Sequence, residues 1–404
     1  MIKKLKEYIQ TKIGWIPFGI ALMFAMKVIG FVPLPMDVID YGLLIVIAIY
    51  LLSKGMKFDG ITMSLLVFIP ISIELSNPNP VFNSWMRYGL FVLLLIVVSP
   101  VLKNASARNF RYRIMHATLI ICTTIAALSF MCYFLGINYM RNQYDGNTLD
   151  YVVNKAGTFG GLTMQSMLLA PIAGIGVLTC TYYALTRRHY KKLFYLFAVM
   201  CAGSMLFAAS RSSLIATICG EMALFYFFSE KTTLFSKRII IILLVGVLTY
   251  PLWNEALEGI NAKNTGEISQ GLNTDSRNEK WDIRLAEFSD SPIWGIGFVA
   301  VSELDNYNRI NGIIEPGSSW LAILSMTGIV GFVLFCSIYF RACRRSLFSY
   351  TPRGALFGSV LVLVGVHMFA EGHIFSGGSY LCFLVWLTIG ACTDYNINEK
   401  YERR

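Results

Sequence analysis

The sequence predicts an all-helical, polytopic membrane protein with about twelve transmembrane helices and one large loop on the outer side. Three observations predict this class. The 404 residues are 55% hydrophobic and only 14% charged, whereas a soluble domain contains about 25% charged residues. Apolar runs of membrane-spanning length recur along the chain. A single long polar segment interrupts them late in the sequence. Together they exclude an ordinary cytosolic enzyme, a disordered protein and a disulfide-stapled secreted domain.

Twelve apolar runs form the candidate transmembrane helices. A span requires about 20 apolar residues, so the chain is long enough for about a dozen spans with connections between them. Most runs are bounded by Gly, Pro, Asn or charged residues, as helix ends usually are. The runs lie near residues 14–34, 38–53, 60–75, 82–102, 114–136, 161–185, 192–209, 211–229, 239–253, 319–340, 354–371 and 376–393.

The basic residues predict the orientation. The net charge of +10 comes from 34 Lys and Arg against 24 Asp and Glu. If the N-terminus is inside, the even-numbered connections and both termini lie inside and carry most of the Lys and Arg, which agrees with the positive-inside rule. We therefore predict that both termini are cytoplasmic and that the basic excess reflects these segments, not nucleic acid binding. The inside connections are residues 54–58, 103–113, 186–191, 230–238 and 341–353.

The organisation predicted along the chain has three parts: nine transmembrane helices in 1–253, a large outer loop in 254–318, and three further helices with a cytoplasmic tail in 319–404. The loop contains eleven Asp and Glu against five Lys and Arg. Loops of this length are usually functional or disordered, and four Trp in or beside this one favour order. Residues 279–288 have apolar side chains at helical spacing, which predicts an amphipathic helix on the membrane surface.

Several arginines lie at the predicted outer face. Arg211 stands between two apolar runs, and Arg87 begins the fourth run. Arg277 and Arg284 are seven residues apart, so on one helix they share a face. The simpler interpretations are snorkelling to lipid headgroups and a solvated charged helix. Guanidinium groups match phosphate oxygens, so arginines around one outer cavity would suit a lipid-linked pyrophosphate, although an anion transporter would also use them.

Other polar residues carry weaker signals. Glu221 lies within a span, where a structural ion pair is the simpler role. His367, Glu371 and His373 are spaced along the outer end of the eleventh run, which favours a polar patch lining an outer cavity over a metal site. The nine cysteines lie mostly in apolar runs and form no CxxC pair. We therefore predict neither a disulfide framework nor a metal site.

Three segments resemble, in order, the signature of the O-antigen ligase and polymerase superfamily. That signature combines a Ser-Arg-Ser segment at the start of a span with an Arg, a Trp four residues later, a short helix, a Pro and a Gly-x-Gly-Phe. The resemblance covers roughly residues 205–380. The matching residues are Ser210-Arg211-Ser212, then Arg277, Trp281, Pro292 and Gly295-Ile296-Gly297-Phe298, then Ser318-Ser319-Trp320-Leu321 with Gly328-Ile329-Val330-Gly331.

The resemblance implies a GT-C-like membrane glycosyltransferase in the bacterial cytoplasmic membrane. It would act outside the cytoplasm on undecaprenyl-pyrophosphate-linked oligosaccharides, without a cofactor or obligatory metal. Arg211 and Arg277 match the family's pyrophosphate-binding arginines, and Arg284 matches less closely. The implied partners are the lipid-linked oligosaccharide, the lipid bilayer, a chain-length regulator and a flippase, with no nucleic acid.

The sequence departs from the family at the presumed catalytic base. Ligases of this family carry a His-Asn pair shortly before the tenth span, whereas residues 254–318 contain no His. Glu315 is the natural substitute, because a carboxylate can act as a general base; its simpler role is a charge at a helix N-terminus. The departure favours a polymerase of O-antigen, capsule or exopolysaccharide over a ligase.

Two alternatives to the polymerase stay open: a ligase that moves the finished glycan onto a lipid or protein, and a flippase of lipid-linked sugars. Transporters often show internal repeats and broken helices, and the sequence shows no pair of corresponding halves. The polymerase hypothesis assigns Glu315, Arg211 and Arg277 to catalysis. It assigns substrate binding to Arg284, Arg87, Trp281, Trp320, Glu371 and His373.

Overall fold

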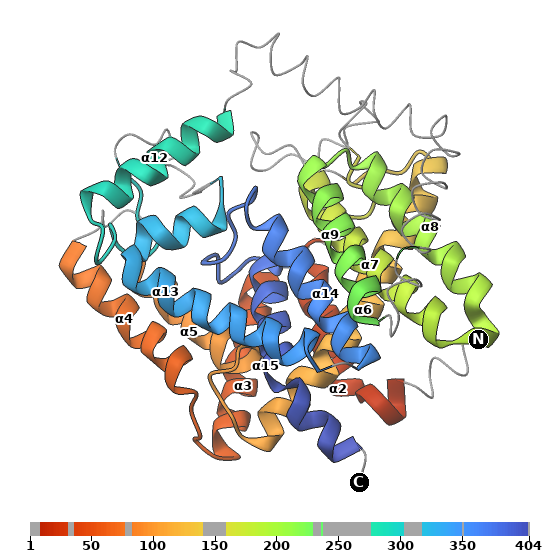
Figure 1. The fold of residues 1–404 in the computed structure, drawn as a ribbon, viewed down its shortest axis with the longest axis horizontal. Coiled ribbons are helices and arrows are strands. Elements are labelled where there is room, and N and C mark those ends of the chain that lie inside the picture. Colours follow the sequence, from red (N-terminus) through yellow and green to blue (C-terminus); the bar gives the residue numbers. More distant parts are fainter. Residues whose placement is uncertain are drawn as a thin grey trace. The chain divides into compact units, whose positions relative to one another are not determined.

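The computed structural model describes residues 9–30, 36–76, 83–139, 159–228, 236, 276–302, 317–349 and 351–402. Over these residues all regular secondary structure is helical, apart from two isolated β-bridges (Figure 1). The predicted all-helical class is therefore confirmed for the described chain. The predicted ninth span and most of the outer loop before Ser276 lie outside the described residues.

Twelve α-helices are described, and eleven of them coincide with predicted apolar runs. The remaining one, α12, confirms the amphipathic helix predicted within the outer loop. The helices are α2 (Trp15–Met26), α3 (Met36–Ser53), α4 (Gly60–Ser76), α5 (Ser84–Val98), α6 (Ala105–Phe134), α7 (Ser166–Thr186), α8 (Lys191–Phe207), α9 (Arg211–Phe228), α12 (Ser276–Asp290), α13 (Ser319–Leu347), α14 (Pro352–His367) and α15 (Tyr380–Glu402), with a π-helical turn at Ile9–Ile13 and a 3₁₀ turn at Arg188–Tyr190.

Three helices, α6, α7 and α13, are long and apolar enough to cross a membrane. Several shorter helices, including α4, α5 and α14, are also apolar. Large apolar side chains are exposed along many of these helices, as expected where lipid replaces water as the solvent. A membrane-embedded protein follows from these features, whereas the total of twelve spans stays a prediction.

The chain folds into two compact units, each assembled from segments that are distant in the sequence. Unit 1 comprises Met1–Met36, Arg113–Leu272 and Ser346–His367; unit 2 comprises Asp37–Tyr112, Asn273–Arg345 and Met368–Arg404. Helices α6 and α13 contribute to both.

Unit 1 is built around α7, which packs against α8, α9 and α14. Glycines allow these helices to approach closely. A side chain at Gly174 would overlap Thr217 of α9, and one at Gly220 would come within 3.0 Å of Leu178. Small residues at helix interfaces are typical of membrane proteins, because close backbone approach increases van der Waals contact where apolar burial provides little driving force.

Unit 2 has an aromatic core where helices and outer loop meet. Phe298, from the segment that follows α12, is fully buried. Its ring lies 5.4 Å from Phe91 of α5 and 5.0 Å from Phe375, and Phe91 lies 5.7 Å from Trp386 of α15 (ring centroids). Aromatic pairs at these distances add to the stabilisation from burial. Phe298 therefore anchors the loop to the helices.

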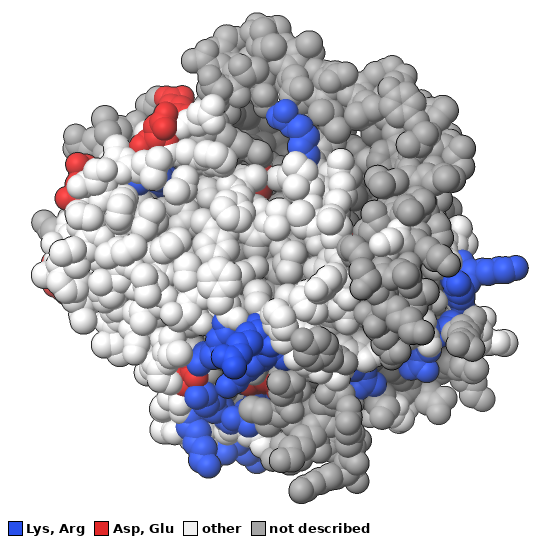
Figure 2. Space-filling model, viewed as in Figure 1, with Lys and Arg blue, Asp and Glu red and all other residues white. Residues whose placement is uncertain are grey.

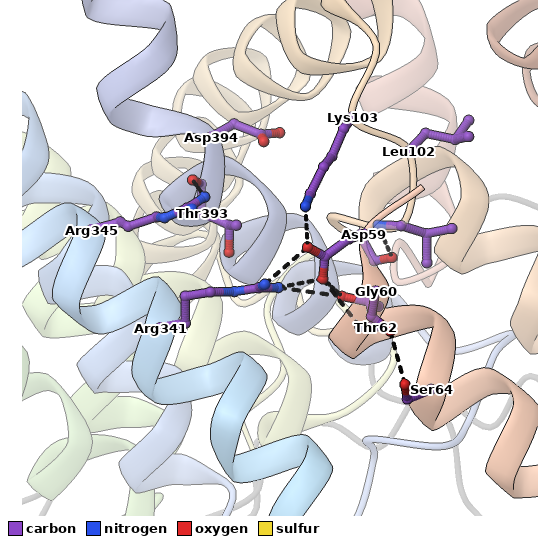
Figure 3. Close-up of polar contacts among 12 residues, drawn as sticks. Asp59, Gly60, Thr62, Ser64, Leu102, Lys103, Arg341, Arg345, Thr393 and Asp394 are labelled. Carbon is purple, nitrogen blue, oxygen red and sulfur yellow. Dashed lines mark hydrogen bonds and ion pairs between the residues drawn. The ribbon is translucent and has the colours of Figure 1, made fainter. Parts of the chain in front are cut away.

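The connections 54–59 and 99–104, which overlap the predicted cytoplasmic connections 54–58 and 103–113, lie together at the N-terminal end of α4. Phe58 and Leu102 form a β-bridge, and the Asn104 side chain donates to the carbonyls of Leu51 and Gly55, at 2.9 and 2.7 Å. Charged side chains from α13 and α15 gather beside them (Figure 3), and Arg108 and Arg111 of α6 contact Asp394 of α15. We call this set the basic network: Asp59, Lys103, Arg108, Arg111, Arg341, Arg345, Thr393 and Asp394.

Asp59 is the buried acceptor at the centre of these contacts. Its carboxylate accepts two hydrogen bonds from Arg341, at 2.9 and 2.6 Å, and lies 2.7 Å from Lys103 Nζ. It also accepts from the backbone N–H and hydroxyl of Thr62 and so caps α4. Burial by itself would raise the pKa of Asp59, but the hydrogen bonds from Arg341, Lys103 and Thr62 outweigh it and lower this pKa below its usual value.

Asp59→Asn is expected to destabilise the protein in a pH-dependent way. Breaking a buried charge pair costs about 3–5 kcal/mol of unfolding free energy. Because the folded pKa is lowered, this contribution is fully present above about pH 5 and is lost as the pH falls toward the folded value. Thermal unfolding in detergent should show a gap between wild type and variant that is constant near neutral pH and narrows below about pH 4. A gap that does not change with pH would contradict this role.

Candidate functional site

The outer end of unit 2 is organised by a buried ion pair in α12. Arg284 Nη1 lies 2.7 Å from Glu287 Oε2, one helical turn further along, and these side chains are only 1% and 0% exposed. The other oxygen of Glu287 accepts a 2.9 Å hydrogen bond from the backbone N–H of Ser302. Glu287 therefore ties α12 to the far end of the segment that follows it.

That following segment docks on a break in α13. Gly328, with φ 62° and ψ −170°, interrupts the helix, and the carbonyls freed there accept hydrogen bonds from the loop. Ile296 N–H donates to the Ser325 carbonyl at 2.9 Å, and Gly297 N–H donates to the Met326 carbonyl at 3.2 Å. In return, Ile329 N–H donates to the Pro292 carbonyl at 2.8 Å. The two glycine motifs seen in the sequence are thus halves of one backbone contact.

Glycine is required at this contact for steric reasons. A side chain at Gly295 or Gly328 would overlap the backbone of the opposite segment, and both residues have positive φ. Ser72 of α4 completes the contact, because its hydroxyl lies 2.7 Å from the Trp294 carbonyl and 3.1 Å from the Met326 carbonyl. A hydroxyl has one hydrogen to share between these acceptors, and either bond fixes α4 to the docked loop.

Gly328→Ala is expected to detach the loop from α13. The new methyl group would clash with the Ile293 carbonyl, and positive φ alone costs about 1–2 kcal/mol for a residue with a side chain. We expect a lower thermal unfolding midpoint and faster proteolysis of the 291–302 segment. Gly89→Ala in α5 is the matched control, because open space surrounds Gly89 and Ala favours a helix. Equal behaviour of the two variants would contradict the docking.

The start of α13 is held by the connection between α14 and α15. Ser319 N–H donates to the Met368 carbonyl at 2.8 Å, and the Ser319 hydroxyl donates to the Glu371 carbonyl at 2.7 Å. That hydroxyl also accepts from His373 N–H at 3.0 Å. The His373 side chain is buried and that of Glu371 is half-buried. The backbones of Glu371 and His373 therefore hold the start of α13, and the polar patch lining an outer cavity stays a prediction; His367 ends α14 in unit 1.

Trp281 joins α12 to the same place. Its indole N–H donates to the Gly317 carbonyl at 3.4 Å, a long hydrogen bond, and the side chain of Lys280 packs against Gly317. Arg277 lies in the first turn of α12, four residues before Trp281 and thus on the same face of the helix. The second turn of α12, the start of α13 and the Glu371 connection consequently form one surface, which we call the outer surface because the sequence predicts that it lies on the outer side.

Other predicted site residues have different surroundings. Trp320 packs against Phe332, Phe335, Tyr339 and Phe369. Arg87 is half-buried in α5. The Arg277 side chain and all of Glu315 lie outside the described residues.

Arg211 begins α9 in unit 1, and its side chain is exposed. The preceding Ser210 caps the helix: its hydroxyl lies 3.1 Å from the Ser213 hydroxyl, and its carbonyl accepts from Leu214 N–H. The Ser-Arg-Ser segment is therefore a helix N-terminus. Free backbone N–H groups and an arginine together favour an anion at such a position.

Residues 196–336 match the family model of O-antigen ligase. The predicted resemblance to the O-antigen ligase and polymerase superfamily is confirmed. The matched segment contains α9, α12, the docked loop and the break in α13, so the superfamily's region coincides with the geometry described above. No curated protein matches the chain. A membrane glycan-processing enzyme of the O-antigen ligase and polymerase type fits both this match and the apolar helices.

Sequence reasoning missed two determinants of this region. It counted Glu287 only among the loop carboxylates, and it assigned nothing to Ser72. Gly328 was the available signal for the contact that Ser72 completes. An isolated glycine inside a helical pattern often has a packing reason. The described residues contain no group of three or more His, Cys, Asp or Glu that could hold a metal ion.

Proposed function

We propose that this protein is a polysaccharide polymerase for O-antigen, capsule or exopolysaccharide. It transfers a growing glycan from undecaprenyl pyrophosphate to the non-reducing end of another lipid-linked repeat unit, on the outer side of the bacterial cytoplasmic membrane. Both termini are cytoplasmic in this proposal. A flippase that delivers the repeat unit and a regulator of chain length are its proposed partners.

The observation that supports the proposal most is the docking of the superfamily's signature loop onto the broken helix α13. This contact gives the signature residues a rigid support, which catalytic groups need in order to hold their geometry. Arg277 and Trp281 belong to the helix supported in this way, and Glu315 precedes Gly317 of the outer surface by two residues in the sequence. Trp281, four residues after Arg277, thus contacts Gly317, two residues after Glu315, whereas Arg211 belongs to unit 1.

In the proposed reaction Glu315 accepts the proton of the acceptor hydroxyl, and the resulting oxygen nucleophile attacks the anomeric carbon of the donor sugar. The bond between that carbon and the pyrophosphate oxygen breaks, and undecaprenyl pyrophosphate leaves with the electron pair. Arg277 and Arg211 stabilise the negative charge that develops on the leaving group, which is where electrostatic catalysis is most effective.

In this proposal Arg284 positions the helix and does not bind the substrate, although substrate binding is the role that its spacing from Arg277 suggested. Its guanidinium is buried against Glu287, so it positions α12 and the loop that carries Phe298. Trp281 and Trp320 support the outer surface, and Arg87, Glu371 and His373 remain proposed substrate contacts.

A ligase is the second candidate, because the matching family model is described as O-antigen ligase. A ligase would use the same donor and the same leaving group but a lipid or protein acceptor. The break in α13 resembles the broken helices of transporters. Here, however, the backbone N–H groups of Ile296 and Gly297 donate hydrogen bonds to the freed carbonyls. We therefore do not extend the proposal to a flippase.

Glu315→Gln is expected to reduce the surface glycan to single repeat units, because the amide cannot accept the acceptor proton. The measurement is the glycan ladder of a deletion strain that carries the wild type or the variant. Glu303→Gln, another carboxylate of the same loop, is the matched control and should keep the full ladder. Loss of every attached glycan would favour the ligase, and a full ladder with Glu315→Gln would remove Glu315 from the mechanism.

A further inference from the structure

The basic network at the opposite end of unit 2 holds more positive charge than its carboxylates neutralise. Asp59 is shared by Arg341 and Lys103. Asp394 is bound by Arg111, with two hydrogen bonds of 2.8 and 2.6 Å. Arg345 donates to a neutral acceptor, the Thr393 carbonyl, at 2.9 Å. A half-buried guanidinium that has only a carbonyl partner favours an additional anion.

Besides Arg108 Nε, which lies 3.8 Å from Asp394 Oδ1, three buried polar atoms of the network have no hydrogen-bond partner among the described residues. They are Arg111 Nη1, Arg341 Nε and Thr393 Oγ1, and the Arg111 side chain is 0% exposed. Buried donors without an acceptor are rare in native proteins. Two of these atoms can only donate and the third is a hydroxyl, so acceptor oxygens are the chemistry that each of them lacks.

Two arginines of the network, Arg345 and Arg111, meet at one turn of α15. Arg345 and Arg111 reach consecutive residues, Thr393 and Asp394. Arg341 precedes Arg345 by four residues on α13, so the two arginines project from the same face of that helix, and Figure 3 shows both extending from α13 into the network. Gly390 makes the approach possible, because a side chain there would press against Arg111 Cδ at 2.8 Å.

The surface around the network is also basic. Lys54, Lys57 and Arg344 are exposed beside it, and Figure 2 shows Lys and Arg side chains grouped on the lower part of the face drawn. Surface charge of one sign raises the local concentration of an oppositely charged ligand. The arrangement therefore combines an attractive surface with specific buried donors.

We propose that the basic network is a binding site for a phosphate group, with Arg345 as its principal ligand. The group belongs either to the headgroup of an anionic phospholipid or to a soluble phosphate. The site is distinct from the outer surface, because α4 runs from Asp59 to Ser72 and α13 runs from Met326 to Arg341 between the two regions. Occupation would tie together the ends of α4, α6, α13 and α15.

The test uses the purified full chain in a neutral detergent and follows thermal unfolding by tryptophan fluorescence. Three titrations are compared: phosphatidylglycerol, phosphatidylcholine with the same acyl chains, and inorganic phosphate against sodium chloride at equal ionic strength. We expect phosphatidylglycerol or inorganic phosphate, but not phosphatidylcholine, to raise the unfolding midpoint. A shift with phosphatidylglycerol alone identifies the lipid as the source, and a shift with inorganic phosphate identifies the soluble ion.

Arg345→Gln is the decisive variant, and Arg344→Gln is its matched control. Both remove one positive charge from the same turn of α13, but Arg344 is exposed and makes none of the network's contacts. Loss of a charge-assisted hydrogen bond should raise the half-saturating concentration about tenfold for Arg345→Gln, with less than a twofold change for the control.

Two results would contradict the proposed phosphate site. Equal weakening in both variants would mean diffuse surface charge, and no anion-dependent shift in the wild type would mean that water satisfies the buried donors. The wild-type titration decides this even if Arg345→Gln does not fold.

Discussion

Arg277→Ala is expected to end chain elongation while the protein remains folded in the membrane. In the proposed mechanism Arg277 stabilises the pyrophosphate only as it departs, so its loss should act on the chemical step. Removing one such donor typically lowers kcat by about 10²–10³-fold. The measurement is the rate at which purified protein lengthens lipid-linked repeat units, together with the thermal unfolding midpoint.

Lys280→Met is the matched control for Arg277→Ala. It removes a positive charge from the same helix, and the methionine stem keeps the packing against Gly317. We expect this control to retain most activity, and Arg277→Lys to retain part of it, because lysine keeps the charge but not the planar fork. Equal losses in Arg277→Ala and Lys280→Met would mean that the loop's overall charge matters, not a specific arginine.

Glu287→Gln is expected to produce the largest loss of stability. The substitution removes the carboxylate charge paired with the buried Arg284 guanidinium, and breaking a buried ion pair costs about 3–5 kcal/mol. Because Glu287 also holds Ser302, weakening this residue should loosen both α12 and the docked loop. We expect a lower unfolding midpoint in detergent, faster proteolysis after α12, and a corresponding loss of elongation.

The double variant Arg284→Met with Glu287→Gln separates positioning from catalysis. Methionine replaces the buried charge with an apolar chain, and the glutamine oxygen can still accept from Ser302 N–H. Replacing a buried ion pair in this way is often neutral for stability. We expect recovered stability and activity within several-fold of wild type. A folded double variant as inactive as Arg277→Ala would show that Arg284 contacts the substrate after all.

Hydropathy and local pattern predicted the helices, because each span must satisfy its own backbone hydrogen bonds and therefore leaves a local signal. The amphipathic helix predicted over 279–288 is observed as α12 over Ser276–Asp290. The spacing of Arg277 and Arg284 correctly indicated one helix. It gave no sign that Arg284 would be buried, because its partner Glu287 is one of many loop carboxylates.

The long-range contacts that hold unit 2 together were not predictable from local pattern. Ser72 and Met326 are separated by 254 residues, and Asp59 and Arg341 by 282. Periodicity identifies the buried side of a helix but not what covers it. The glycine motifs were visible in the sequence. Only the backbone geometry shows that a side chain at Gly295 would overlap the backbone of Met326, and one at Gly328 the backbone of Ile293.

The most direct test of the proposed function is elongation by the purified protein in liposomes that contain an undecaprenyl-pyrophosphate-linked repeat unit. We predict glycans longer than one repeat, with one undecaprenyl pyrophosphate released for each new linkage, and neither product with Arg277→Ala. Transfer of the glycan only to an added lipid or protein acceptor, or movement of the intact substrate across the bilayer without elongation, would contradict the polymerase.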